Sequence, residues 1–112
     1  MNNGGNKMKK IKVNPGVCGL ESIIIAEKKG RKDVTVSVDS KCPAVKKMIE
    51  TLEQPLDGYS VVFDNKPGTG PIYAAASVLT HAACPVAAAV VKCIEAECGL
   101  ALPRTTTFTF EE

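Results

Sequence analysis

The chain has 112 residues, a formal net charge of +2, 45% hydrophobic residues and 4% aromatic residues. A chain of this length is expected to form one domain with a real core. So small a net charge gives no sign of a nucleic-acid or membrane-surface partner. No apolar run reaches the ~18 residues that a membrane-spanning helix needs. Because aromatic residues are scarce, aliphatic side chains must supply most of the core.

The first ten residues, MNNGGNKMKK, lack the apolar stretch of a signal peptide. We expect residues 1–10 to be a disordered leader and residues 11–112 to form a single domain. Five cysteines is an odd number, and without a secretory signal a disulfide framework is not expected. The sequence therefore predicts a cytoplasmic protein, in which the cysteines are core residues, metal ligands or redox thiols.

The N-terminal half has the period of a β-hairpin. Residues 11–13 form a short strand candidate that ends at the turn signal Asn14-Pro15-Gly16. Residues 20–27 contain a run of three isoleucines, and residues 34–38 place valine at every second position. This alternation indicates strands with one buried face, and the basic, glycine-containing connection between them indicates an antiparallel hairpin.

Three helices are expected further along the chain. An apolar stripe at i, i+3, i+4 and i+7 predicts a helix that starts at Pro43 and ends before Pro55. Residues 59–63 are a possible short strand, after which Pro71 opens a helix over residues 72–81. Pro85 opens a third helix over residues 86–97, with Gly99 as its C′ residue.

Residues 105–110 are β-branched and aromatic, which predicts a final strand that pairs with the edge of the hairpin. The fold class is therefore α+β, with a small, mostly antiparallel sheet made of the N-terminal hairpin and the C-terminal strand. About three helices pack against this sheet.

Cysteines occupy the places where two helices begin. Cys42 precedes Pro43 and Cys84 precedes Pro85, so a thiol stands where Ser, Thr, Asp or Asn is the usual cap. The unpaired N–H groups at a helix start favour the thiolate, which is the form that binds metals and acts as a nucleophile. Strand geometry places Cys18, before the hairpin, at the same open end of the ribbon as Cys42, after it.

His81 and Cys84 form an H-x-x-C pair at the junction of the last two helices, close enough in sequence to serve one site. Sequence alone does not settle whether Cys84 joins the other two cysteines. Cys93 lies inside the third helix and Cys98 at its C-terminus, where the negative end of the dipole disfavours a thiolate. We interpret Cys93 and Cys98 as packing residues.

The series Cys18-Gly19, a β-hairpin, Cys42 at a helix start, then His81 and Cys84 opening a late helix resembles the NifU/IscU-type iron–sulfur scaffold domain. The resemblance covers roughly residues 13–97. It implies that Cys18, Cys42 and Cys84, with His81, hold a zinc ion or a nascent iron–sulfur cluster, and that a sulfur-donor or cluster-acceptor protein is the partner. More narrowly, the chain is similar to a small group of uncharacterised prokaryotic proteins with CG, CP and HAxCP signatures.

Two other functions stay open. The first is metal-free thiol chemistry, such as a persulfide carrier with Cys42 or Cys84 as nucleophile. The second is an interaction module whose cysteines are only structural. The glycine-rich residues 65–71 lack the Gly-Lys-Ser/Thr of a P-loop, so we expect a flexible loop or lid there rather than a phosphate site. With one histidine and no recognisable catalytic set, the sequence favours a binding protein over an enzyme.

Overall fold

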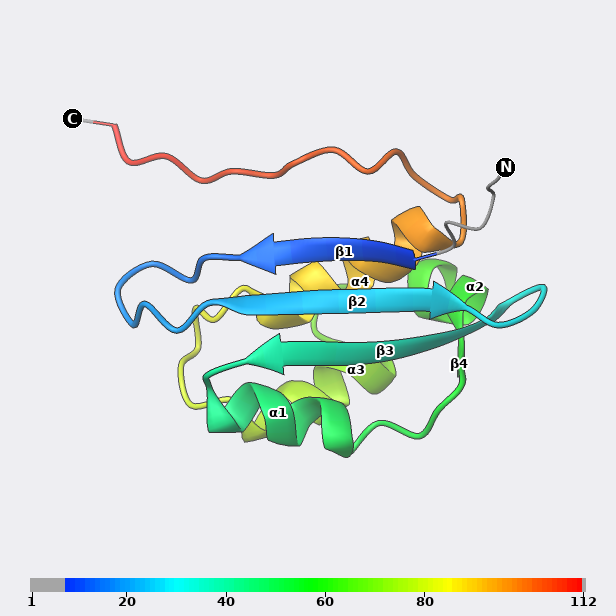
Figure 1. Cartoon of the computed structure of the whole chain (residues 1–112), viewed down its shortest axis with the longest axis horizontal. Helices are drawn as coiled ribbons and strands as arrows, with labels where there is room; N and C mark the ends of the chain where they lie inside the picture. The colour runs from blue at the N-terminus through cyan, green and yellow to red at the C-terminus, as the bar shows by residue number, and fades with distance from the viewer. Residues whose placement is uncertain (1–7, 112) are drawn as a thin grey trace.

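The computed structural model describes residues 8–111, in which a single sheet lies on a group of helices (Figure 1). The elements are β1 (Met8–Val13), β2 (Ser22–Lys28), β3 (Asp33–Ser40), α1 (Pro43–Glu50), β4 (Leu56–Asp57), α2 (Gly58–Phe63), α3 (Gly70–Ala75), the 3-10 helix η1 (Ala76–Val78) and α4 (Val86–Glu97). The α+β class expected from the sequence is confirmed.

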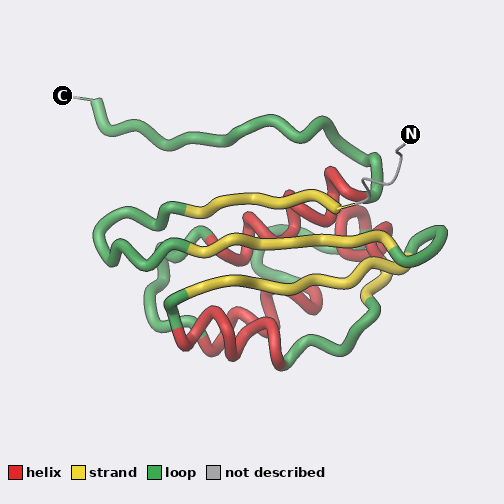
Figure 2. The backbone as a smooth tube through the Cα atoms, viewed as in Figure 1, coloured by secondary structure: helices red, strands yellow, loops and turns green. Residues whose placement is uncertain are grey.

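The sheet is antiparallel throughout, in the order β1-β2-β3-β4. Ser22, at the start of β2, lies opposite both Val13 at the end of β1 and Ser40 at the end of β3. The hairpin of β2 and β3 is thus confirmed, with β1 added on one side. Figure 2 shows the three long strands side by side.

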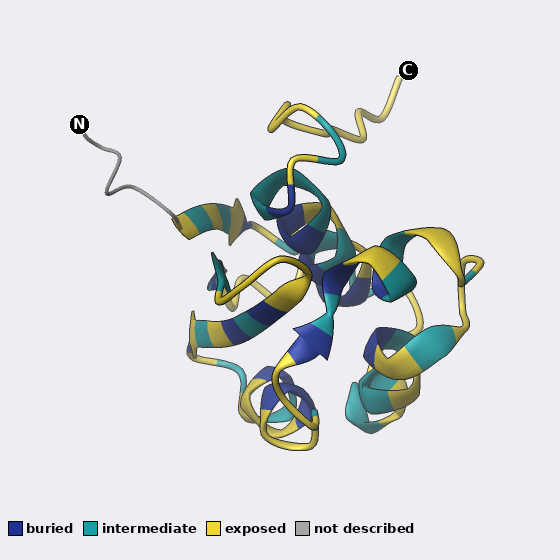
Figure 3. Ribbon diagram, turned by 90° about the vertical axis from the view of Figure 1, so that its right-hand side faces the viewer, coloured by how far each residue is buried: buried dark blue, intermediate teal, exposed yellow. Residues whose placement is uncertain are grey.

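Period-2 alternation decides which face of the sheet is buried. Ile24 and Ala26 of β2 and Val34 and Val36 of β3 are at most 4% exposed, whereas the residues between them are half-buried or exposed. Figure 3 shows this alternation along the strands. The buried face is the one that the helices cover.

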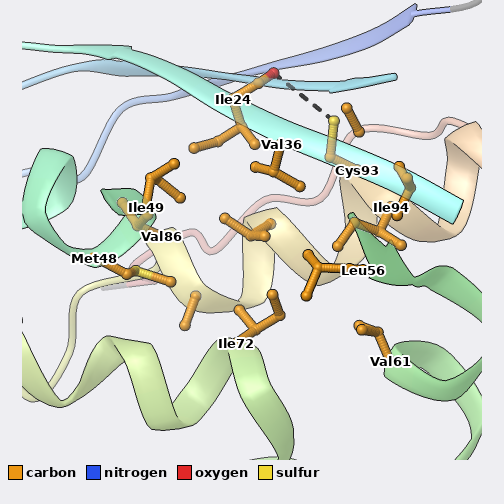
Figure 4. Packing of buried hydrophobic residues seen from close by; sticks show 14 of the residues in the cluster. Ile24, Val36, Met48, Ile49, Leu56, Val61, Ile72, Val86, Cys93 and Ile94 are labelled. Carbon is orange, nitrogen blue, oxygen red and sulfur yellow. Dashed lines mark hydrogen bonds between the residues drawn. The ribbon is translucent and has the colours of Figure 1, made fainter. Parts of the chain in front are cut away.

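Two helices lie directly on the sheet, α4 against β1 and β2 and α1 against β3. Helices α2 and α3 pack on α4, and η1 packs on α1. The apolar core fills the space between these layers, as Figure 4 shows for Ile24, Met48, Ile72 and Ile94. Each of these four side chains is completely buried or nearly so.

Helix α4 has the bounds that the sequence predicted, Val86–Glu97. Gly99 adopts a positive φ of 75°, which a residue with a side chain rarely adopts. Its N–H donates to the Ala96 carbonyl at 3.1 Å, and the Leu100 N–H donates to the Glu95 carbonyl at 2.9 Å. This pair of bonds is the Schellman motif, so the predicted role of Gly99 as C′ residue is confirmed.

The short strand expected at residues 59–63 is wrong, because these residues form α2. The carboxylate of Asp57 accepts a hydrogen bond from the Ser60 N–H at 3.1 Å and caps the helix. The strand in this region is β4, which pairs with the start of β3. Beyond that pairing, the Gln54 side-chain amide extends the ladder by accepting from the Val36 N–H at 2.6 Å and donating to the Val36 carbonyl at 2.9 Å.

The helix expected over residues 72–81 is shorter than predicted. It ends as α3 at Ala75, continues as the 3-10 turn η1, and the chain is extended at Leu79. Ser, Val and Thr follow Ala76 within four residues, and all three are weaker helix formers than alanine. Within residues 8–111 the sheet is accompanied by four α-helices, α1 to α4, where about three were expected.

The final strand expected at residues 105–110 is wrong for the single chain. Residues 102–111, called here the 102–111 segment, are all exposed and have no strand partner among the described residues. A strand without a neighbour leaves its backbone N–H and carbonyl groups unpaired, so these residues do not form a strand despite their β-propensity. At the other end, β1 begins at Met8 and takes in three residues that we expected in the leader, while residues 1–7 lie outside the described residues.

Candidate functional site

Three segments that carry cysteines lie at one end of the sheet, called here the cysteine end. The loop after β1 carries Cys18, and α1 begins after Cys42. Because Ser22 lies opposite both Val13 and Ser40, the loop that joins β1 to β2 and the start of α1 leave the sheet at the same end. The expectation that Cys18 and Cys42 share the open end of the hairpin therefore agrees with the strand register.

The direction of α4 brings Cys84 to the same end. The Lys28 N–H, at the far end of β2, donates to the carboxylate of Glu97 at 2.8 Å, and the Cys93 thiol lies 3.8 Å from the Ile24 carbonyl. Helix α4 thus runs in the same direction as β2. With 1.5 Å per helical residue and about 3.3 Å per strand residue, Val86 lies roughly at the level where β2 begins. Figure 1 shows the loop to α4 on the same side as the start of α1.

Cys42 is held by two buried serines that we did not single out from the sequence. The Ser22 hydroxyl donates to the Ser40 hydroxyl oxygen at 2.7 Å, and the same oxygen accepts from the Cys42 N–H at 3.0 Å. Ser22 and Ser40 are 1% and 6% exposed. Both occupy positions that the strand alternation directs into the core, and a serine in such a position is the signal that could have found them.

The Cys42 residue is the N-cap of α1, as expected, with Pro43 at the first helical position. Its backbone is extended, with φ of −89° and ψ of 116°, and its side chain makes no capping hydrogen bond. The half-buried thiol packs against the core and does not hydrogen-bond to the N–H groups at the start of α1.

Cys84 is held in a turn with His81, because the Cys84 N–H donates to the His81 carbonyl at 3.1 Å. The expectation that Cys84 caps the third helix is wrong, since the N-cap of α4 is Pro85. Proline has no N–H to leave unpaired, which suits this position. Cys84 is half-buried and His81 is exposed, so the turn presents both residues near the surface.

Cys18 lies in the most irregular part of the cysteine end. It is exposed, between two glycines that both have positive φ, 95° at Gly16 and 68° at Gly19. The Gly19 N–H donates to the Gly16 carbonyl at 3.0 Å, which closes a tight turn around the cysteine. The loop is therefore shaped by its own turn and not by packing on the core.

The predicted ligands share one end of the molecule without forming a ready metal site. Within residues 8–111, no group of three or more His, Cys, Asp or Glu side chains is arranged to hold a metal ion. A tetrahedral zinc site needs four donors at about 2.0–2.3 Å from the metal. The thiol and imidazole groups at the cysteine end are donor types that suit zinc, but in this structure they are not placed around a common point.

Cys93 and Cys98 have the packing role that we expected. Both are buried in the apolar core, with Cys93 0% and Cys98 6% exposed. The Cys93 thiol donates to the Lys9 carbonyl at 3.2 Å. Burial raises the pKa of Cys93 to about 11, and burial also raises the pKa of Cys98. These two thiols are thus kept protonated and away from solvent.

The pKa of Cys93 predicts a loss of stability in alkaline solution. Because folding raises this pKa from 9.0 to about 11, the unfolded chain releases the proton first as the pH rises. The contribution of the protonated Cys93 thiol to the free energy of unfolding is therefore fully present below pH 9 and is lost between pH 9 and pH 11. The free energy of unfolding should fall by no more than about 1.4 kcal/mol per pH unit on this account. Urea unfolding of Cys93→Ala should show a shallower decline with pH than the unaltered protein.

Cys18→Ala is the control for this experiment, because it removes an exposed thiol and should leave the decline unchanged. A Cys93→Ala protein that loses stability with pH as steeply as the unaltered protein would contradict the assignment.

Two hollows in the surface lie away from the cysteines. One, of about 170 Å³, is lined by the loop at residues 65–69 together with apolar residues of α2, α3 and α4. A wider one, of about 350 Å³, lies between the tip of the β2–β3 hairpin and α2. Neither has a cysteine in its lining.

Comparison with known proteins places the chain in one family. Residues 9–110 match the model of DUF6951, a family of unknown function, and the chain belongs to that family. No curated protein and no solved structure matches the chain. Across residues 8–111, none of the helices has the length and apolar character that crossing a membrane requires.

Proposed function

We propose that this member of DUF6951 is a small metal- or iron–sulfur-binding protein with a carrier-like role, whose ligands are Cys18, Cys42, Cys84 and His81. The observation that carries the proposal is the convergence of three separate segments at the cysteine end. The register of β1, β2 and β3 brings two of them there, and the direction of α4 brings the third. The resemblance of the cysteine series to NifU/IscU-type scaffold domains supports the same function.

The chemistry of the four donors suits a soft or borderline metal. Three thiolates and one imidazole make a tetrahedral set that zinc accepts, and cysteine thiolates are the usual ligands of small iron–sulfur clusters. Cys42 and Cys84 are both half-buried thiols at the edge of the apolar core. A metal held between them would be shielded on the side of the core and open on the side of solvent.

The site is completed when the metal binds. Cys42 is the fixed donor, because its backbone is tied to the buried serine pair. Cys18 and His81 lie in an exposed loop and an exposed turn, which have fewer contacts to lose when they move. Metal sites commonly gain their order from binding, and the thiols release protons in the process.

Elemental analysis and an absorption spectrum of protein purified without oxygen test the proposal. We expect one zinc ion or one small iron–sulfur cluster per chain, and we expect metal-free protein to take up zinc in a titration against a competing chelator. Changing Cys18, Cys42 or Cys84 to serine should weaken zinc binding by more than about 100-fold, the upper range for groups that only support a ligand.

The matched control is Cys98→Ala, which removes one thiol that lies in the core at the far end of α4. Zinc affinity should be the same in this variant as in the unaltered protein. The proposal fails if the purified protein holds neither zinc nor iron and the titration shows no uptake. It also fails if Cys98→Ala reduces binding as much as Cys42→Ser.

A metal-free thiol carrier is the second candidate, and the lack of a ready ligand group within residues 8–111 favours it. In this case Cys42 or Cys84 carries a persulfide sulfur. The probe is inorganic polysulfide, which transfers one sulfane sulfur to the cysteine thiolate and leaves as a polysulfide that is one sulfur atom shorter. Mass spectrometry should then find one added sulfur atom on one of these cysteines, and a thiol reductant should remove it. Uniformly slow alkylation of all five cysteines would contradict this candidate.

The five cysteines are all free thiols, which supports a location in the reducing cytoplasm. A carrier in that compartment needs a sulfur-donor or cluster-acceptor protein as partner. We infer a binding role and not catalysis, because the thiol and imidazole groups proposed at the cysteine end are typical metal ligands. Co-purification of metal with the protein from cells, but not with Cys42→Ser, is the corresponding result in vivo.

A further inference from the structure

We propose that the 102–111 segment adds as a strand to the free edge of β1 in a second copy of this chain, so that two copies exchange these segments and form a symmetric dimer. The proposal concerns a surface away from the cysteine end and does not depend on metal binding. It rests on an open sheet edge and a segment with a strand pattern and no strand partner, both among the described residues, and on the acidic end of the sequence, which suits the basic edge of β1.

The open edge belongs to β1. The order of the sheet is β1-β2-β3-β4, so β1 pairs with β2 on one side and with no described strand on the other. In an antiparallel pair, every second residue directs its N–H and carbonyl groups away from the neighbour. Part of the backbone between Lys9 and Val13 thus faces the side where another strand can be added, as in β-augmentation.

The segment that fits this edge has the pattern of a strand. Thr106, Phe108 and Phe110 alternate with three other threonines, so the two aromatic rings share one face. Phe108 is 90% exposed and Phe110 is 101% exposed. Figure 3 shows the segment standing clear of the sheet and the helices. Apart from a local hydrogen bond from the Arg104 N–H to the Leu102 carbonyl, no described strand pairs with this backbone.

The acidic end of the sequence complements the basic side chains of β1. β1 carries Lys9, Lys10 and Lys12 and no acidic residue. Lysines on an edge strand normally deter pairing with other chains. Lys9 and Lys12 form ion pairs with Glu97 and Glu21 of the same chain, so a partner strand needs to compensate only part of this charge. The sequence after Phe110 is Glu111-Glu112, and the one basic residue of the segment, Arg104, lies near its other end. The acidic end of a second copy is thus suited to the lysines of β1.

Exchange between two copies gives a closed assembly. Each copy has one free β1 edge and one 102–111 segment. If the segment of each copy pairs with β1 of the other copy, both β1 edges are covered. The alternative, in which the segment returns to its own β1, is not adopted in this structure, where residues 102–111 are all exposed. Addition to a second copy is therefore the arrangement that we propose.

Sedimentation velocity on the full chain at micromolar concentrations tests this proposal. We expect a species of twice the 11.8 kDa chain mass, weakened by salt because Lys–Glu attraction is screened. The double variant Phe108→Ser/Phe110→Ser should raise the dissociation constant at least about tenfold. Thr107→Pro should do the same, since proline lacks the N–H of a strand. Both changes lie in exposed chain, and circular dichroism should show an intact fold.

Phe63→Ser is the matched control, because Phe63 is also an aromatic residue with an exposed ring, 66% exposed, but lies at the end of α2. It should leave the dissociation constant within about twofold. A chain that stays monomeric overturns the proposal. This includes a monomer whose residues 105–110 are protected from hydrogen exchange, because the segment then pairs within its own chain. A dimer that the Phe108→Ser/Phe110→Ser variant does not weaken overturns it as well.

Discussion

Replacing Ile94 with alanine should lower the free energy of unfolding by about 2–5 kcal/mol, the range measured for large-to-small changes in well-packed cores. Ile94 is 0% exposed and lies on α4, where the sheet, β4 and α2 meet (Figure 4). The lost side chain leaves a cavity whose walls belong to several elements, so no single element can relax to fill it. Urea unfolding followed by circular dichroism measures the change.

A smaller truncation at the same position and a truncation at the surface serve as comparisons for Ile94→Ala. Ile94→Val removes a single methyl group and should cost about 0.5–1.5 kcal/mol. Val17→Ala is the control, because Val17 is completely exposed and its truncation should change the free energy of unfolding by less than about 0.5 kcal/mol. An Ile94→Ala protein as stable as Val17→Ala would show that α4 is not packed as described.

Replacing Gly58 with alanine should destabilise the protein by about 1–3 kcal/mol through overpacking. A Cβ at this position would overlap the Cys98 sulfur and would lie 3.3 Å from the Lys32 carbonyl oxygen. The close approach is needed there because the Gly58 N–H donates to the same carbonyl at 2.8 Å. The contact ties the start of α2 to the tip of the β2–β3 hairpin.

Removing the obstructing sulfur should relieve this cost. In the double variant Gly58→Ala/Cys98→Ala, the new methyl group takes the place of the sulfur, so the loss of stability should be smaller than the sum of the two single losses. We expect a coupling free energy of about 0.5–3 kcal/mol. Gly30→Ala is the control, because a Cβ on Gly30 meets no atom within 4 Å. Strictly additive losses would contradict the described packing.

The hairpin, α1 and α4 were predictable because their signals are local. Alternation in β2 and β3 and the apolar stripe of α1 each arise within a dozen residues, and Gly99 marks the end of α4 by a property of its own backbone. The sequence also separated the cysteines correctly into two that are buried, Cys93 and Cys98, and three that are not.

The errors come from segments whose structure depends on a partner far away in sequence. Residues 59–63 have the composition of a strand, yet the Asp57 cap and the packing of Val61 on α4 make them helical. Residues 105–110 have a strand pattern but no neighbouring strand in the single chain. β-propensity reflects how well a side chain packs against a neighbouring strand, and the composition of a segment does not reveal whether such a strand is present.

By itself the sequence determined the α+β class, the bounds of α4 and the separation of buried from accessible thiols, because each follows from periodicity, capping or burial preference within a short stretch. Only the tertiary structure decided that Cys84 reaches the end of the sheet where Cys18 and Cys42 lie. That placement depends on the direction in which α4 crosses β1 and β2, which is fixed by contacts between residues about 70 positions apart, such as Lys28 with Glu97. The buried serine pair beneath Cys42 also depends on pairing between strands, because Ser22 and Ser40 lie opposite each other at the ends of β2 and β3.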